Sequence, residues 1–331
     1  MQTYLGLDLG GTKLLIGEVT RTGAVLRSKR YSTGYTRQRD AVTGMMAALE
    51  DYRVTVGFTG DLTAVGAGVV GTVDNPRGEW IALGHEPTGA PVPLAAMLTE
   101  RLGVPAYIDN DVRSAVTAEL VLGCGKYSDN FIYLNVGTGL AAGFVINRQI
   151  LRGANHNAGE IGHMSVDITN RDACICGRHG CAENTVSGAG FTHMVKKYGR
   201  TDLLLPDTGR ADVPRLFTLA AQGDADCTAI ADYAADTLAC VIMNLVRVSD
   251  PDMVVFGGGI MSDAWFQERV RARLEPGTMR GVTHGLVPSS FSPHIAGLLG
   301  AASLGMRENR RVPDTWHPRL LRLKRISSLL Y

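Results

Sequence analysis

The sequence lacks the features of three large classes of proteins: membrane-spanning proteins, secreted proteins, and proteins that bind nucleic acid or anionic membranes through a high net charge. No stretch approaches the ~18 consecutive apolar residues that a membrane-spanning helix needs. The N-terminal segment has no basic leader ahead of an apolar run, so it does not resemble a secretory signal. The 33 basic and 32 acidic residues leave a formal net charge of +1, which provides no field to attract nucleic acid or an anionic membrane. We therefore expect a soluble, cytoplasmic protein that binds neither.

The length of the chain indicates more than one domain. A single hydrophobic core rarely grows beyond ~300 residues, and this chain has 331 residues of which 45% are hydrophobic. No low-complexity linker separates two halves, so we expect the boundary in a helix that follows Asp111. We expect a smaller α/β domain at residues 1–115 plus about 297–331, and a larger α/β domain at 116–296. The basic end of the chain, from Arg319 to Arg325, is expected to be an exposed tail.

A strand, a glycine-threonine turn and a second strand occur twice along the chain. The first copy runs from Asp8 to Gly17 and the second from Asn135 to Gly143. Such internal similarity predicts two related halves that face each other across a cleft. Hydrophobic periodicity predicts helices at 37–51, 93–102, 111–122, 224–249, 263–275 and 297–309, and strands at 65–70, 105–109 and 253–256.

The two turns of this repeat are candidates for binding phosphate. In the first, backbone N–H groups can approach a phosphate while a carboxylate holds hydrated Mg²⁺. The matching turn would bind the same nucleotide from the other side of the cleft. An ordinary hairpin turn explains each of them when it is taken alone. The first turn comprises Asp8, Gly10, Gly11, Thr12 and Lys13, and the second comprises Gly137, Thr138 and Gly139.

A third glycine-rich turn follows the apolar strand MVVF. Gly257, Gly258 and Gly259 lie between this strand and a helix, without the spacing of a dinucleotide-binding fingerprint. We assign the turn to close approach of the backbone by adenosine. The alternative is a turn that only connects the strand to the helix and binds no ligand.

Asp109, Asn110 and Asp111 end an extended segment and begin a helix. Asp111 could simply cap that helix. Phosphoryl transfer to an alcohol, however, needs a carboxylate that accepts the hydroxyl proton. The neighbouring motifs decide between the two interpretations.

Three cysteines and a histidine form a strong metal-binding pattern. Cys174, Cys176 and Cys181 have the spacing C-x-C-x4-C, and His163 precedes them in Gly-Glu-Ile-Gly-His. Such ligands predict a tetrahedral, structural zinc site that orders the loop carrying Glu160 and Glu183. Free cysteines packed as small apolar residues are the alternative.

Together these motifs resemble the ROK family, which comprises bacterial sugar kinases and related repressors of the actin-like ATPase superfamily. The resemblance extends to about residue 305 and rests on DLGGTK, AYIDND, NVGTG, GEIGHM, CICGRHGCAE and VVFGGG. It implies a two-domain, actin-like (ribonuclease H-like) α/β fold with a cleft between the domains. It also implies an ATP-dependent kinase that uses Mg²⁺ and acts on a small sugar or polyol. Many members form dimers, so a homodimer is expected.

The resemblance also assigns roles to individual residues. It makes Asp111 the general base for the acceptor hydroxyl and places the three glycine-rich turns around ATP. His163 would bind zinc through one imidazole nitrogen and face a sugar hydroxyl with the other. The residues that it places around the acceptor are Gly71, Asn110, Asp111, Glu160, His163 and Glu183.

The departures from the family pattern concern the acceptor. Family glucokinases carry Gly-x-Pro-Gly where this chain has 68–71, and Asn-Leu-Pro-x-Trp where it has 85–89. His156 and Asn157 stand where smaller residues are usual. Phosphorylation of the 6-hydroxyl of a hexose such as glucose is therefore the default, and an amino sugar or a C7 cyclitol is the alternative acceptor.

A sugar-responsive regulator of the same family is the alternative from another class. Such regulators carry a helix-turn-helix domain ahead of the first phosphate motif. Here that motif begins at Asp8, and the near-neutral charge gives no basic surface for DNA, so a kinase is favoured.

Overall fold

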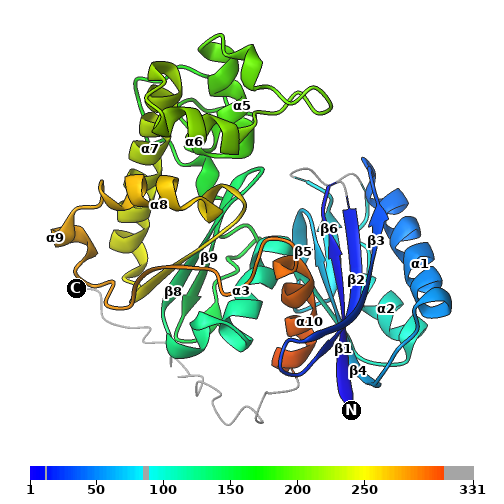
Figure 1. Ribbon diagram of the computed structural model, residues 1–331. Coiled ribbons are helices and arrows are strands. Elements are labelled where there is room, and N and C mark those ends of the chain that lie inside the picture. Colours follow the sequence, from blue (N-terminus) through cyan, green and yellow to red (C-terminus); the bar gives the residue numbers. More distant parts are fainter. Residues whose placement is uncertain (12, 85–88, 309–331) are drawn as a thin grey trace, which may run out of the picture.

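The computed structural model describes residues 1–11, 13–84 and 89–308. Thr12, the segment 85–88 and the basic tail from Arg319 to Arg325 lie outside the described residues. The described chain contains two five-stranded sheets with helices packed on them (Figure 1).

The first sheet has the strand order β3-β2-β1-β4-β7. The first three strands are antiparallel neighbours, whereas β1, β4 and β7 are parallel. A two-stranded hairpin follows β4. The strands are β1 (Gln2–Leu9), β2 (Lys13–Thr20), β3 (Val25–Ser32), β4 (Asp61–Val69) and β7 (Ala106–Asn110), with β5 (Thr72–Asp74) and β6 (Glu79–Ala82) in the hairpin.

The second sheet repeats the same arrangement. Its order is β10-β9-β8-β11-β12, again with an antiparallel group on one side and parallel strands on the other. The repeat predicted from the two glycine-threonine turns is confirmed, because β1–β2 and β8–β9 occupy corresponding places in the two sheets. The strands are β8 (Phe131–Val136), β9 (Leu140–Ile146), β10 (Gln149–Ile150), β11 (Met253–Gly257) and β12 (Gly285–Pro288).

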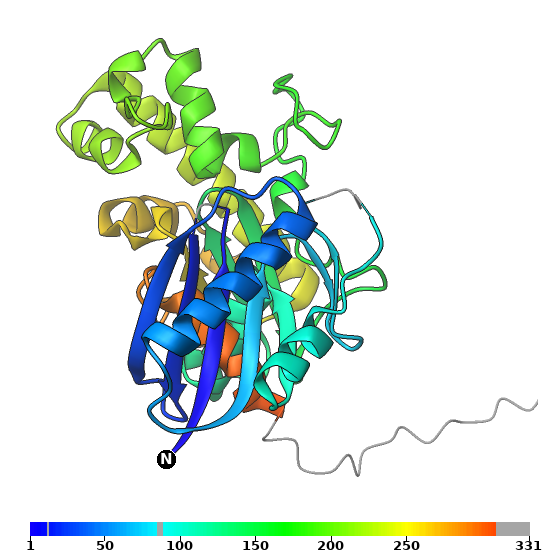
Figure 2. The same cartoon turned by 90° about the vertical axis from the view of Figure 1, so that its right-hand side faces the viewer.

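Helices cover both faces of the first sheet. Two of them pack their apolar sides on its outer face, where the long helix α1 crosses the strands in Figure 2. The C-terminal helix α10 lies against the opposite, inner face. The helices of this half are α1 (Gln38–Thr55), α2 (Leu94–Leu102), α3 (Asp111–Val121) and α10 (Ala296–Glu308).

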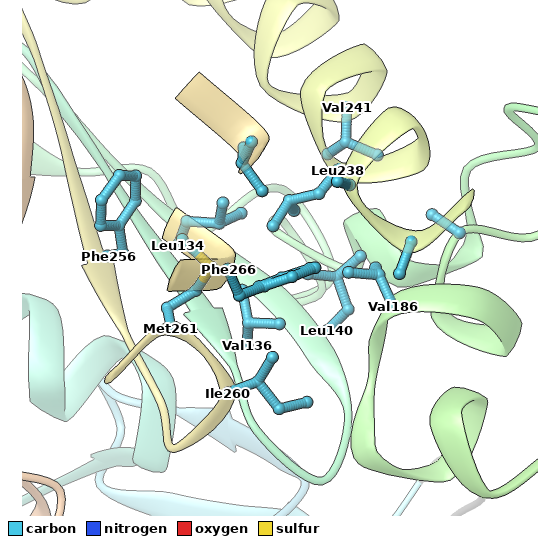
Figure 3. Close-up of a cluster of buried hydrophobic side chains, with 14 of the residues drawn as sticks. Leu134, Val136, Leu140, Val186, Leu238, Val241, Phe256, Ile260, Met261 and Phe266 are labelled. Atoms are coloured by element: carbon cyan, nitrogen blue, oxygen red, sulfur yellow. The ribbon is translucent and has the colours of Figure 1, made fainter. Parts of the chain in front are cut away.

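The largest core lies on the outer face of the second sheet. Figure 3 shows Leu134 and Val136 of β8 packed with Phe266 and with residues of α7. One helix here, α7, is long and apolar enough to cross a membrane by composition, but 61% of its apolar window is buried inside the protein. Burial of this kind is what a core helix shows. The helices of this half are α4 (Glu183–Val186), α5 (Gly188–Lys197), α6 (Val213–Ala221), α7 (Ala225–Ser249), α8 (Ala264–Arg271) and α9 (Pro276–Met279).

Helix α3 connects the two sheets. One side of it, with Ala118 and Val121, packs with α10 and the first sheet. The other side, with Val116 and Leu120, packs on strands of the second sheet. The helix that begins at Asp111 therefore lies where the two halves meet. We propose a domain boundary within it, near residue 115, with α10 belonging to the first domain.

The inner helix α10 approaches the first sheet so closely that two strand positions have no room for a side chain. A Cβ atom on Gly66 of β4 would lie 1.7 Å from the carbonyl oxygen of Ala301, and one on Gly6 of β1 would lie 2.5 Å from that of Leu298. Both obstacles are backbone atoms, which cannot move away as a flexible side chain would.

We therefore predict that Gly66→Ala lowers the free energy of unfolding by about 3 kcal/mol, because α10 must shift away from the sheet. The control is Gly277→Ala in α9, where nothing lies within 4 Å of the added methyl group. That change should stay within about 1 kcal/mol of the parent protein. Urea unfolding followed by circular dichroism measures both; equal effects at the two sites would contradict the packing described.

Candidate active site

The junction of β7 and α3 positions the candidate base. The side chain of Asn110 accepts a hydrogen bond from the N–H of Arg113 at 2.8 Å, so Asn110 is the helix cap. The alternative interpretation of Asp111 as the cap is thus wrong. One carboxylate oxygen of Asp111 accepts from the N–H of Val112 at 2.9 Å. Because Asn110 caps the helix, the carboxylate of Asp111 in the first turn of α3 is not needed for capping.

Asp111 lines one cavity with parts of both halves of the chain. The cavity has a volume of ≈ 210 Å³ and brings together the first phosphate turn, the start of α3 and the third glycine turn. Residues of these three motifs that line it are Asp8, Gly10, Lys13, Asp111 and Gly258. The structure therefore brings together Asp8 and Gly258, which are 250 positions apart in the sequence.

A buried carboxylate, that of Asp8, and a half-buried one, that of Asp111, share this cavity. Burial raises the pKa of Asp111 to about 6, and the nearby charge of Asp8 and then that of Glu160 act in the same direction. Burial also raises the pKa of Asp8, while the ammonium group of Lys13 opposes that shift. A carboxylate with a raised pKa is a better proton acceptor than an exposed aspartate at neutral pH.

The two phosphate-turn candidates occupy corresponding places at the ends of paired strands. Asp8 and Leu9 pair with Leu15 and Leu14 on either side of the first turn, and Val136 pairs with Leu140 across the second. The N–H of Gly10 donates to the carbonyl oxygen of Lys13 at 2.9 Å, which closes the first turn. Thr12, expected in the same turn, is outside the described residues.

A second, larger cavity of ≈ 960 Å³ adjoins the second and third turns. Gly137 and Thr138 of the second turn and Gly259 of the third turn line it. The N–H groups of Gly188 and Ala189, which begin α5, donate to the carbonyl oxygens of Gly137 and Thr138 at 2.8 and 3.1 Å. The second turn is thereby fixed to the start of a helix.

Most of the wall of this larger cavity was not identified from the sequence. It comes from α5, from the loop before α6, from α6 itself and from the segment after the third turn. Asn135, in the smaller cavity, was also missed as a site residue, although it corresponds to Asp8 in the internal repeat. The residues of the larger wall are Gly188, Ala189, Thr192, Thr208, Gly209, Arg210, Ala211, Val213, Pro214, Phe217, Ile260, Ser262 and Asp263.

The four expected metal ligands converge. One ligand atom from each of His163, Cys174, Cys176 and Cys181 lies within 4.8 Å of all the others. The Nδ1 atom of His163 is 3.4 Å from the sulfur of Cys174, and the sulfurs of Cys176 and Cys181 are 3.6 Å apart. Burial raises the pKa of the Cys181 thiol to about 12, so without a cation this thiol stays protonated. The donor set and its size fit a tetrahedral cation that binds thiolates.

Glu183 connects the cysteine loop to the second turn. Its Oε2 atom accepts a hydrogen bond from the N–H of Leu140 at 2.9 Å, directly after Gly139. A Cβ atom on Gly139 or Gly162 would lie 2.8 or 3.0 Å from the same oxygen. This oxygen of Glu183 is thus committed to the protein backbone.

The remaining acceptor candidates lie on turns that are tightly packed. Gly71 has φ +98° and no room for a Cβ atom, which would lie 2.1 Å from the carbonyl oxygen of Ala82. Gly159, with φ +106°, is pressed against Ala142 in the same way. Glu160, which follows it, is exposed and makes no side-chain hydrogen bond to the residues that the structure describes. Its position is therefore set by the loop that carries it.

Comparison with known proteins identifies the family. The model of the ROK family matches residues 4–308, which is nearly the whole chain. The chain belongs to the ROK family. Its two-domain, actin-like α/β fold is the one that the sequence motifs imply.

Similar ROK-family relatives carry different names. A protein of Thermotoga maritima named glucokinase is 30% identical over 91% of this chain and 96% of its own length. A protein of Salmonella newport named N-acetyl-D-glucosamine kinase is 27% identical over 92% of this chain and 100% of its own. The crystal structure of a ROK family glucokinase from Streptomyces griseus, in complex with glucose and AMPPNP, has a TM-score of 0.72 and 26% identity, and the match covers 91% of this chain and 98% of that one.

The raised pKa of Asp111 predicts a dependence of stability on pH. A carboxylate whose pKa is higher in the folded state than in the unfolded state destabilises the fold when it is ionised. The loss is complete above pH ~6 and disappears as the pH falls to ~3, where the group is protonated in both states. Asp111→Asn should therefore raise the free energy of unfolding by about 1–3 kcal/mol at pH 8 and leave it almost unchanged at pH 3. Thermal or urea unfolding without nucleotide checks this, and a variant that is less stable at pH 8 would contradict it.

Proposed function

We propose that this ROK-family protein is an ATP-dependent sugar kinase that transfers the γ-phosphoryl group of ATP to a hydroxyl of a hexose, with the 6-hydroxyl of a sugar such as glucose as the default. Asp111 is the general base. The observation that carries this proposal is the single cavity in which the carboxylate of Asp111 meets Asp8, Lys13 and the glycine turns. The cytoplasmic location and the homodimer expected from the resemblance belong to the same proposal.

The donor would lie across the two cavities. Adenosine fits the larger one beside Gly259, and the phosphates pass Gly137–Gly139 towards the first turn at Gly10 and Gly11. Asp8 is the candidate for holding Mg²⁺, since a buried carboxylate gains from a neighbouring cation. When bound, this ion neutralises charge on the phosphates. Lys13 adds a positive charge on the same side of the cavity.

The acceptor would lie between Asp111 and Glu160. Support comes from the charge of Glu160, which contributes to the raised pKa of Asp111, and from the loop before Glu160, whose carbonyl groups at His156 and Ala158 accept hydrogen bonds from Arg113 of the same helix. Asn110, His163 and Gly71 are proposed as further parts of its site, as the family resemblance implies. For Glu183 we propose an indirect role, because its Oε2 atom already accepts from Leu140.

In the proposed reaction the acceptor oxygen attacks the γ-phosphorus in line with the leaving group. A bond forms between this oxygen and phosphorus, and the bond from phosphorus to the bridging oxygen breaks to release ADP. Asp111 accepts the hydroxyl proton as the new bond forms. Its pKa of about 6 leaves it ionised, yet basic, near pH 7.

This role predicts an acid limb in the pH profile. The value of kcat/KM for the acceptor should fall below pH ~6, with a slope of one, because protonated Asp111 cannot accept a proton. Steady-state assays at saturating Mg·ATP between pH 5 and 9 measure it. Activity that stays constant down to pH 5 would argue against Asp111 as the base.

The acceptor itself is tested by a panel. Release of ADP from Mg·ATP should depend on one member of a set comprising glucose, mannose, their 2- and 3-amino and N-acetyl derivatives, fructose and a C7 cyclitol. Glucose as much the best substrate would support the default, whereas preference for an amino sugar or the cyclitol would support the alternative acceptor. Sugar binding without turnover by the folded protein would contradict the kinase and favour a sugar-responsive regulator.

We further propose that His163, Cys174, Cys176 and Cys181 hold a structural zinc ion. The convergence of their ligand atoms within 4.8 Å supports this, and four protein ligands leave no open position for catalysis. The ion would cross-link the loop from which Glu183 reaches the second glycine turn.

Removal of zinc should therefore weaken the site without acting on the reaction directly. We expect about one zinc per chain by elemental analysis, and a loss of it in Cys181→Ser. The variant should unfold at a lower temperature and have a raised KM for the acceptor. A fully metal-free wild-type protein with the same melting temperature and KM would rule out the zinc proposal.

A further inference from the structure

A loop of the second half, residues 152–160, is bound to the first half and to α3 on several sides. Arg152 forms an ion pair with Asp109, which is fully buried at the end of β7. The hydroxyl of Thr72 donates to the side-chain oxygen of Asn157 at 3.4 Å. These contacts tie the loop to strands that lie on the other side of α3. The loop ends at Glu160, the proposed acceptor-binding carboxylate.

Arg113 makes the most central of these contacts. It lies two positions after Asp111 in α3 and is only 2% exposed. One of its terminal nitrogens, Nη2, donates to the carbonyl oxygens of His156 and Ala158 at 2.7 and 3.1 Å. The same turn of helix therefore carries the candidate base and holds the backbone that leads to Glu160.

The hydrogen bonding of Arg113 is incomplete for a buried guanidinium group. Its Nε and Nη1 atoms are buried and have no hydrogen-bond partner in the described structure, and Nη1 is 4.0 Å from Asp109. A buried charge with unsatisfied donors is a poor source of stability. The presence of Arg113 is better explained by the loop backbone at His156 and Ala158, which its Nη2 atom holds in place.

His156 provides an independent sign that this loop is constrained. Its φ angle is +58°, a left-handed conformation that residues other than glycine rarely adopt. Its Nε2 atom lies 3.6 Å from a carboxylate oxygen of Asp74 on β5, across from the loop. A strained backbone that is held from two directions is typical of a position where geometry matters for function.

We propose that Arg113 is a positioning residue of the acceptor site, which fixes Glu160 relative to Asp111 by binding the loop carbonyl groups of His156 and Ala158. The His156–Asp74 contact is a second anchor of the same loop. The inference rests on the proposed function, in which Glu160 binds the acceptor. Arg113 itself touches no substrate and takes no part in proton transfer.

The test is a double-mutant cycle on the KM for the acceptor identified in the panel. Arg113→Met should raise this KM about tenfold, since two charge-assisted hydrogen bonds to the loop are lost, while the KM for ATP changes less than about twofold. In a Glu160→Gln background the same substitution should add less than about twofold, because the group that Arg113 positions is already disabled. The matched control is Arg271→Met, which removes a similar hydrogen bond from Nη2 to the carbonyl oxygen of Leu286. That change should leave the acceptor KM unaltered.

The outcomes separate the two proposals. Equal effects of Arg113→Met in both backgrounds would overturn the positioning role and leave the kinase function intact. If Glu160→Gln has no effect on the acceptor KM, the proposed acceptor site is wrong and the positioning role falls with it.

A second variant covers the case in which Arg113→Met does not fold. His156→Gly suits the local φ angle, so the protein should fold with an unchanged or higher melting temperature. Loss of the Asp74 contact should still raise the acceptor KM about threefold, again only when Glu160 is present. An unchanged acceptor KM in this variant would count against a constrained loop.

Discussion

The close approach of α10 to the first sheet and to α3 is the constraint on which the rest of the structure depends. A Cβ atom on Gly300 would lie 2.8 Å from the backbone of Ser114, and one on Gly297 would lie 2.2 Å from a carboxylate oxygen of Asp8. Backbone therefore packs on backbone where the two halves meet. Because α3 begins at Asp111, this packing also sets the place of the candidate base relative to the first phosphate turn.

The proposed chemistry depends on charged groups whose ionised forms are costly for the fold. Asp8 and Asp111 are carboxylates with raised pKa values in one small cavity, and Arg113 is a buried cation with unsatisfied donors close by. Each of the two carboxylates would stabilise the fold better as a neutral residue. A site that binds a cation and a phosphate and moves a proton explains why they are present, and it implies that stability has been exchanged for function.

The sequence predicted the elements that have local signals and missed those that depend on distant contacts. The glycine-threonine repeat predicted the two related sheets because each turn connects two strands that are neighbours in the sequence. The helix predicted at 224–249 was found as α7, whereas that at 263–275 ends at Arg271. The wall of the larger cavity was missed because residues such as Arg210 and Phe217 reach it through tertiary packing alone. The hydrogen bond from Arg113 to the carbonyl oxygen of His156 could not be predicted from the sequence either, because the two residues are 43 positions apart.

The central claim is that Asp111 accepts the proton during phosphoryl transfer while the binding of both substrates depends on other groups. Rapid-quench measurement of γ-phosphoryl transfer in Asp111→Asn, with ATP and acceptor bound at saturation, tests it most directly. The account predicts that the variant binds both substrates with nearly unchanged affinity and that transfer is about 10²–10⁴ times slower. A transfer step at close to the wild-type rate would show that another group, or none, is the base.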